Sequence, residues 1–332
     1  MMKLLISLLV LLALAYAPRV RAEANEVRIV MPYGLGYLPV YVAVDRGLIQ
    51  QRAAAAGLGE VKVTLTHMAS GPASSDLILS GDADLAMGGF GPAFVLWDKT
   101  KGKIRIMTPL SGGPILLLSN DPHLRTIKDI GPNDRIAISA LKVTAQALAM
   151  QMAAAKDYGW DQRFKFDSNL VPMSNPDGMA IVLSGQGAVR SQLAITPFAD
   201  EMLESGKVHL VMNSEDYIEA GSSISALYVA AKFHEASPKL YAATAAAMED
   251  AFAFIKSNPH EAAQIYVAHE PQKRDLAWIE AMVTNPKIMR YSSTPKGFQK
   301  GADFMFEAGT LKTKPASWKD LVWENMWGKD GS

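Results

Sequence analysis

The chain of 332 residues contains no cysteine. Disulfide bonds are therefore excluded, and the fold must be held together by its hydrophobic core. A lipid-modified N-terminus is excluded as well, because that modification is made on a cysteine at the cleavage site. We therefore expect no membrane anchor.

The sequence has no excess of charge of either sign, since 33 lysine and arginine residues stand against 33 aspartate and glutamate residues. Nucleic acids and anionic membranes attract strongly basic proteins, and this composition supports neither as a partner. The expected partner is a small molecule or another protein.

Long hydrophobic runs are missing after the N-terminus. One apolar stretch runs from Leu4 to Ala17 behind Lys3, and it is shorter than the roughly 20 residues of a transmembrane helix. Small residues at Val20 and Ala22 place the favoured cleavage site before Glu23. The sequence predicts a signal peptide over residues 1–22 and a mature chain that is soluble in the periplasm.

Motifs for catalysis and metal binding are also absent. None of the six histidines stands at the short helical spacing of a zinc site, and there is neither a Gly-x-Ser-x-Gly turn nor a Walker loop. The sequence predicts no metal, no cofactor and no enzymatic activity.

The sequence does contain one repeated motif, which is called the repeated phrase below. SGPASSDLILSG at 70–81 returns as SNPDGMAIVLSG at 174–185, and KGKIRIM at 101–107 falls at the same offset on SGKVHLV at 205–211. A constant offset over separate segments favours duplicated architecture over chance similarity.

Each copy reads as strands alternating with helices, the pattern of parallel sheets covered on both faces. The expected strands are 27–33, 61–68, 84–88 and 103–108, then 135–139, 168–173, 191–196 and 207–212. The expected helices are 39–47, 72–80 and 92–100, then 144–157, 176–183 and 197–204.

Two copies of this pattern predict two lobes. The first lobe is expected to cover 23–115, the second 116–228, and the helices of 229–332 are expected to return to the first. Extended segments near 113–121 and 223–230 would connect the lobes as a hinge. The ligand would lie in the cleft at the carboxyl ends of both sets of strands.

Four segments carry a resemblance to a known family: VRIVMPYGLGYLPVYVAVDRGLI, LILSGDADLAMGG, TIKDIGPNDRIAIS and KFHEASPKLYAATAAAMEDAF. They resemble the periplasmic substrate-binding proteins of ABC transporters in the nitrate, sulfonate and taurine group. The resemblance implies a two-lobed α/β fold of the type II periplasmic-binding-protein class, with two open, mostly parallel sheets and a two-crossing hinge.

The resemblance also implies a function. A monomer of this family captures a small solute and delivers it to an ABC permease, and the solute here would be a small anion: a sulfonate, a taurine-like compound, an aromatic or aliphatic carboxylate, or nitrate. The same fold carries a pyrimidine-synthesising enzyme related to thiamine biosynthesis. That enzyme, a binding protein for a vitamin precursor and the sensor lobe of a regulator remain alternatives.

Loops at the carboxyl ends of the expected strands supply the candidate ligand site. In the first lobe these residues are Tyr33, Gly36, Tyr37, Ser70, Gly71, Ser74, Gly89 and Phe90. In the second lobe they are Lys142, Thr144, Ser174, Thr196 and Phe198. Glycines allow a ligand to approach the backbone, aromatic rings suit stacking, and Lys142 is the sole cation expected at this edge.

The two lobes differ at the starts of their helices. Residues that cannot cap with a side chain precede the prolines of the first lobe: Leu38, Gly71 and Gly91. Residues that can cap stand at the corresponding positions of the second lobe: Thr144, Asn175 and Thr196. The acidic group of the ligand is therefore expected on the 70–75 and 88–92 turns of the first lobe, where backbone N–H groups would remain free.

Overall fold

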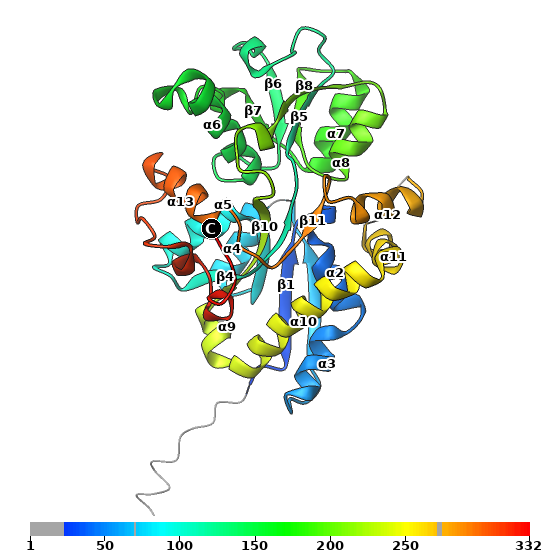
Figure 1. Cartoon of the computed structure of the whole chain (residues 1–332), viewed down its shortest axis with the longest axis vertical. Helices are drawn as coiled ribbons and strands as arrows, with labels where there is room; N and C mark the ends of the chain where they lie inside the picture. Colours follow the sequence, from blue (N-terminus) through cyan, green and yellow to red (C-terminus); the bar gives the residue numbers. More distant parts are fainter. Residues whose placement is uncertain (1–22, 70, 271–273) are drawn as a thin grey trace, which may run out of the picture.

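The computed structural model describes residues 23–69, 71–270 and 274–332, and these residues fold around two separate sheets (Figure 1). The first sheet has the strand order β11-β4-β10-β3-β1-β2, and the second has the order β7-β6-β8-β5-β9. The strands of the first are β1 Glu26–Met31, β2 Lys62–His67, β3 Leu85–Gly89, β4 Ile104–Gly112, β10 Ser223–Ala230 and β11 Arg290–Tyr291. Those of the second are β5 Leu116–Ser119, β6 Arg135–Ile138, β7 Leu170–Pro172, β8 Val189–Ala194 and β9 His209–Asn213. The two-lobed α/β fold expected from the sequence is confirmed.

Each sheet has a parallel part and one antiparallel strand inserted within it, and the first sheet also has β11 at its edge, antiparallel to β4. β2, β1 and β3 are parallel neighbours, as are β7, β6 and β8. β10 lies antiparallel between β3 and β4, and β5 lies antiparallel between β8 and β9. Both inserted strands come directly after a crossing between the sheets, so each enters its new sheet at the carboxyl edge and must run back toward the opposite edge.

The chain crosses between the sheets twice. The first crossing joins Gly112 at the end of β4 to Leu116 at the start of β5, and the second joins Asn213 to Ser223. The sequence analysis placed the end of the second lobe at residue 228. This residue lies inside β10, which pairs with β3 and β4 of the first sheet.

Helices cover both faces of the first sheet. On one face lie α2 Leu38–Asp45, α3 Leu48–Ala55, α10 Pro238–Ser257, α11 Pro259–His269 and α12 Leu276–Thr284. On the other lie α4 Gly71–Ser80, α5 Phe90–Lys99 and α13 Phe298–Glu307. The second sheet is covered by α6 Ala145–Tyr158, α7 Asn175–Ser184 and α8 Phe198–Glu204, while the short α9 Ala231–Ala236 follows β10. No helix in the described residues has the length and apolar character needed to span a bilayer.

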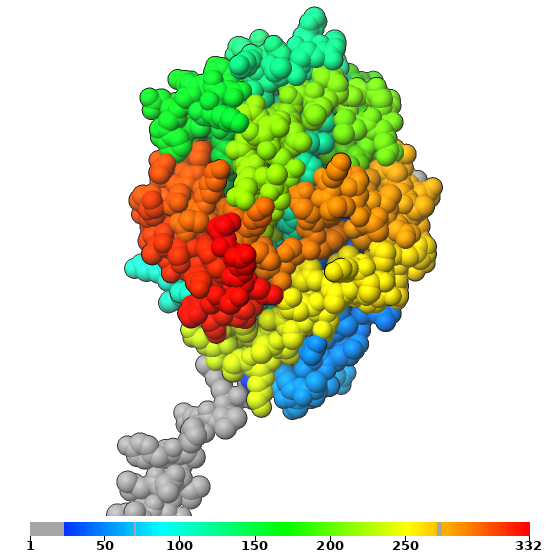
Figure 2. Space-filling model, in the orientation of Figure 1, coloured from blue at the N-terminus to red at the C-terminus, as the bar shows by residue number. Residues whose placement is uncertain are grey.

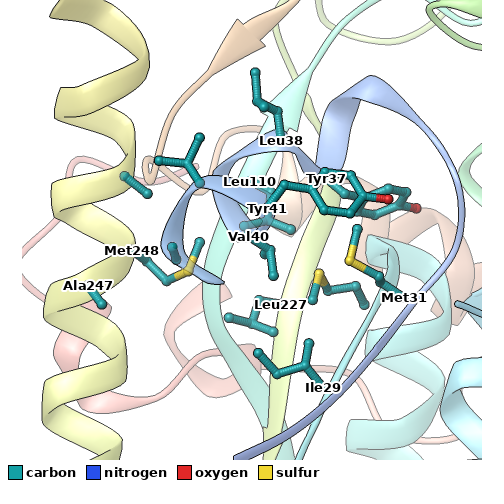
Figure 3. Close-up of a cluster of buried hydrophobic side chains, with 14 of the residues drawn as sticks. Ile29, Met31, Tyr37, Leu38, Val40, Tyr41, Leu110, Leu227, Ala247 and Met248 are labelled. Atoms are coloured by element: carbon teal, nitrogen blue, oxygen red, sulfur yellow. The ribbon is translucent and has the colours of Figure 1, made fainter. Parts of the chain in front are cut away.

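The core of the first lobe shows why the second half of β1 is apolar at every position. Ile29 and Met31 pack on one side of β1 with α2 and α10, whereas Val30 packs with the helices on the other side. Figure 3 shows Ile29 and Leu227 below the side chain of Met248 from α10. Burial on both faces removes the alternation of polar and apolar residues that a half-exposed sheet would show.

The repeated phrase forms equivalent elements in the two lobes. α4 follows β2, the edge strand beside β1, and α7 follows β7, the edge strand beside β6. The glycines that end the two phrases, Gly81 and Gly185, have φ values of 85° and 68°. Glycine adopts this left-handed conformation without steric cost, so both helices can stop in the same way.

The C-terminal segment contacts both lobes. In Figure 2 its orange side chains lie between the green second lobe and the yellow and blue first lobe. Glu204 of α8 accepts a hydrogen bond from the indole N–H of Trp278 at 2.6 Å and forms an ion pair with Arg274 at 3.0 Å. Arg290 of β11 pairs with Glu215, which lies beside the second crossing.

The helix caps of the second lobe correct two assignments made from the sequence. Thr144 caps α6 as expected, with its hydroxyl accepting from the N–H of Ala147 at 3.2 Å. α7 begins one residue earlier than expected, so Ser174 caps it in place of Asn175. α8 begins one residue later, so Pro197 stands at the N-cap position and Thr196 is not the cap.

The helices of the first lobe lack side-chain caps at two starts. The residues at the N-cap positions of α2 and α5 are Tyr37 and Gly89, not Leu38 and Gly91, and neither forms a side-chain cap. The residue before α4 is Ser70, which lies outside the described residues.

Replacing Ser174 by alanine should lower the free energy of unfolding by about 1 kcal/mol. The reason is that the Ser174 hydroxyl, which accepts a hydrogen bond from the N–H of Asp177 at the start of α7, is lost. Urea unfolding monitored by circular dichroism measures this change. Ser257→Ala is the control, since that exposed hydroxyl donates to the carbonyl of Ala253 and caps no helix start. Equal stabilities for the two variants would contradict the capping role.

Candidate functional site

A cavity of about 60 Å³ lies between the two sheets. It is formed at the carboxyl ends of β1, β2, β3 and β4 from the first sheet and of β6, β7 and β8 from the second. Its walls are Pro32, Gly36, Tyr37, Ala69, Gly71, Gly89, Ser111, Ile115, Ser139, Thr144, Ala145, Gln146, Asn175, Ile195, Thr196, Ile224, Ser225 and Met289. Open α/β sheets bind ligands at this edge, so we take this cavity as the candidate site.

A larger hollow of about 670 Å³ lies elsewhere, at the opposite edge of the first sheet. Arg28 near the start of β1, Asp84 just before β3 and Lys103 just before β4 line it. It contains none of the residues expected to bind ligand and receives no wall from the second lobe. Its size reflects a surface groove, and we do not assign the ligand to it.

Six of the residues chosen from the sequence meet at the cavity: Gly36, Tyr37, Gly71, Gly89, Thr144 and Thr196. Ser70 lies outside the described residues. The others do not line it. Ser74, Phe90 and Phe198 are buried, Ser174 caps α7, and Tyr33 is 39% exposed and stacks on His67 with ring centroids 4.6 Å apart.

Lys142 also lies outside the cavity, and its side chain is exposed. Its φ of 72° places it in the left-handed region within the turn before α6. Its charge acts on Asp167, where it opposes the rise in pKa that burial causes in that carboxyl. No charged side chain therefore lines the cavity among the described residues.

Sequence reasoning missed a polar group on the second lobe. The side-chain N–H₂ of Gln146 donates to Asn175 Oδ1 at 3.0 Å and to the carbonyl of Leu193 at 2.9 Å, while its Oε1 accepts from Ser139. Gln146 stands at the second position of α6 among apolar residues, which is the signal that could have revealed it. Asn175 was assigned only as a cap.

Two side-chain hydrogen-bond donors of the cavity wall have no partner among the described residues and are available to a ligand. Asn175 uses its Oδ1 for Gln146, and its Nδ2 group has no partner among the described residues. The hydroxyl of Tyr37, whose side chain is buried, likewise has no partner among them. Burial raises the pKa of Tyr37, so this hydroxyl keeps its proton and can donate.

The remaining hydroxyls of the wall are already engaged. Ser111 and Ser225 bond to each other with oxygens 2.7 Å apart. Thr144 donates to the carbonyl of Ala140. Thr196 bonds to the carboxyl of Asp200, whose pKa is raised by burial. These residues shape the cavity but offer few donors to a ligand.

The starts of α5 and α6 face each other across the cleft. A Cβ atom added at Gly89 would lie 3.1 Å from the backbone nitrogen of Ala145, and one added at Gly91 would lie 2.0 Å from the carbonyl oxygen of Val143. Both helix starts carry partial positive charge. An anion placed between them would be attracted by both, which is how helix N-termini bind anions.

The described residues form two sheets with a cavity between them. No protein-family model matches the chain, and no curated protein sequence matches it. Solved structures do match it. The alkanesulfonate-binding protein SsuA from Xanthomonas axonopodis pv. citri, bound to MOPS, superposes with a TM-score of 0.70 at 16% identity over 91% of this chain and 99% of that one.

Two further structures agree. The periplasmic aliphatic sulphonate-binding protein SsuA from Escherichia coli has a TM-score of 0.66 at 15% identity, covering 92% of this chain and 99% of that chain. The periplasmic nitrate-binding protein NrtA from Synechocystis PCC 6803 has a TM-score of 0.70 at 16% identity, covering 92% and 88%. The chain therefore has the fold of the periplasmic binding proteins, and its likeness to the nitrate and sulfonate group holds at the level of fold. These neighbours are binding proteins, not enzymes.

Gly91→Ala should weaken ligand binding while leaving each lobe folded, because the added methyl group would collide with Val143 and keep the lobes apart. Small-angle scattering should show a larger radius of gyration than for the wild-type protein. Gly59→Ala is the matched control, since nothing lies within 4 Å of its added Cβ. An unchanged radius and affinity in Gly91→Ala would show that the observed approach of α5 and α6 is not needed for binding.

Proposed function

We propose that this protein is the solute-binding component of an ABC importer and captures a small anion in the cavity between its lobes. The observation that carries the proposal is the composition of the cavity wall. It contains no charged side chain, yet it faces the starts of α5 and α6 and holds the free donors of Tyr37 and Asn175. Such a wall selects a group that accepts hydrogen bonds and carries negative charge.

The acidic group is proposed to lie against the start of α5 on the first lobe. α5 has neither a side-chain cap nor an acidic residue in its first turn. On the second lobe, α8 carries Asp200 and Glu201 in its first turn, and Asp200 stands directly behind Thr196. An anion is therefore favoured at the first-lobe side and disfavoured near Thr196.

The cavity size limits what the contacting lobes can enclose. Ligand pockets ordinarily measure roughly 300–1,000 Å³, whereas this cavity measures about 60 Å³. A sulfonate, a carboxylate or nitrate is the expected class of head group, and an organic body attached to it requires the lobes to separate further. The hinge crossings at Gly112–Leu116 and Asn213–Ser223 are the segments that would move.

The cellular setting follows from the same proposal. The mature protein, a monomer without a membrane anchor, is proposed to work in the periplasm after removal of a signal peptide over residues 1–22 and to deliver its solute to an ABC permease. The solved sulfonate and nitrate neighbours support this setting through their fold. A vitamin-precursor ligand is tested in the same screen as the anions.

A thermal-shift screen tests the proposal with nitrate, taurine, ethanesulfonate, MOPS, acetate, benzoate and a pyrimidine precursor of thiamine as separate probes. A true ligand present at 100 times its dissociation constant should stabilise the protein by about 2.7 kcal/mol. Stabilisation only by the uncharged pyrimidine probe would contradict the anion proposal, and no stabilisation by any anion would also count against it.

For the anion that gives the largest shift, Asn175→Ala should weaken binding by roughly tenfold, the loss of one charge-assisted hydrogen bond. Lys142→Ala is the matched control and should bind as the wild-type protein does, since Lys142 lies outside the cavity. Isothermal titration calorimetry compares the two. The opposite ranking would place the anion at Lys142 and not at the start of α5.

A further inference from the structure

One charged side chain is buried among the described residues, and it lies outside the cavity. Glu270 follows the last residue of α11 and is 4% exposed, whereas the other buried polar residues are neutral. Burying a carboxylate costs free energy unless hydrogen bonds compensate it. A buried charge in a binding protein therefore calls for a structural or functional reason.

Three donors converge on this carboxylate. Its Oε1 accepts from the backbone N–H of Gly34 at 2.8 Å and from the hydroxyl of Tyr41 at 2.6 Å. Its Oε2 accepts from the hydroxyl of Tyr266 at 3.0 Å. Tyr41 also meets His67 Nε2 at 2.6 Å, and because Tyr41 donates to Glu270, His67 must carry a proton on that nitrogen.

The bond to Gly34 joins segments 236 positions apart in the sequence. Gly34 has a φ of 143°, a conformation favourable only for glycine, and it precedes the short 3₁₀ turn Leu35–Tyr37 that leads into α2. Glu270 thus brings a negative charge to the start of this helical segment, where a helix N-terminus favours one.

The same turn forms part of the cavity wall, through Gly36 and Tyr37. Its other backbone groups are also held from a distance, because Leu35 O accepts from Tyr291 at 3.1 Å and Gly36 O from Ser225 at 3.5 Å. On its outer side, a Cβ added at Gly34 would lie 3.4 Å from Ile195 of the second lobe. The turn is therefore both a wall of the site and a point of contact between the lobes.

We propose that Glu270 is a positioning residue of the ligand site, which holds the Gly34–Tyr37 turn in the conformation that presents Gly36 and the Tyr37 hydroxyl to the ligand. It does so without touching the ligand. The consequence for affinity rests on the proposed function, whereas the hold on the turn does not depend on it.

The negative charge of Glu270 is not what holds the turn; its hydrogen-bond acceptors are. A glutamine at this position would keep one oxygen to accept from Gly34 and Tyr41, and its N–H₂ group could donate to the oxygen of Tyr266. Glu270→Gln should therefore keep the turn in place. Glu270→Ala removes every acceptor and should release it.

Hydrogen exchange of the free protein tests the hold on the turn. In Glu270→Ala the Gly34 amide and the amides of residues 35–37 should exchange at least tenfold faster than in the wild-type protein, and Glu270→Gln should restore the wild-type rate. Tyr241→Phe is the matched control, since Tyr241 belongs to the same core cluster and donates to Asn325, at a site remote from the turn. Wild-type protection of the turn in Glu270→Ala would overturn the proposal.

Affinity for the strongest anion of the screen provides the second readout. Glu270→Ala should weaken binding by roughly ten- to a hundredfold, the effect of one hydrogen bond to a charged group, and Glu270→Gln should bind as the wild-type protein does. Loss of protection with unchanged affinity would also overturn the proposal, while leaving the proposed function intact. A wild-type protein that binds no anion would remove the proposed function, and the exchange rates would still decide whether Glu270 holds the turn.

Glu270→Ala could also fail to fold. In that event Tyr266→Phe replaces it, because it removes the hydrogen bond from the Tyr266 hydroxyl to Oε2 and leaves the residues of the turn unchanged. Faster exchange of residues 34–37 in Tyr266→Phe than in Tyr241→Phe supports the proposal, and equal rates in the two variants overturn it.

Discussion

The approach of two helix starts across the cleft is the constraint on which the rest of the site depends. Gly91 in the first turn of α5 meets the backbone of Val143, two residues before the start of α6, with no side chain of Gly91 between them. A Cβ atom added at Gly91 would meet the carbonyl oxygen of Val143, and one added at Gly89 would meet the backbone nitrogen of Ala145. The two lobes therefore touch through backbone atoms at the place where we propose that an anion binds.

Glycine makes this approach possible, and for a steric reason. Gly89 and Gly91 stand where any side chain would enter the backbone of the second lobe, and Gly71 and Gly88 allow α4 to touch the end of β3. None of these four residues has a positive φ. They are glycines because of what lies beside them, not because of their own backbone conformation.

The sequence predicted the fold far better than the site. Periodicity and the offset between the two copies located the central strands and helices within a few residues, because buried strands and helix starts leave local signals. The sequence did not predict α3. It also did not predict that β5 and β10 run antiparallel to their neighbours, because that depends on where the chain crosses between the two sheets. Lys142 was chosen as the one cation at the carboxyl end of an expected strand, but the structure gives it a left-handed backbone and places it outside the cavity. Gln146 and Glu270 were missed because their partners are distant in sequence.

The helix starts around the cleft explain why one of them is left for the ligand. Thr144 caps α6, and Ser174 caps α7 with Asp177 in its first turn. α8 has two acids in its first turn, and the segment leading into α2 receives Glu270 from the core. Of α5, α6, α7 and α8, only α5 has neither a side-chain cap at its start nor an acidic residue in its first turn. α5 is therefore the helix start at which we propose that the negative charge of a ligand is bound.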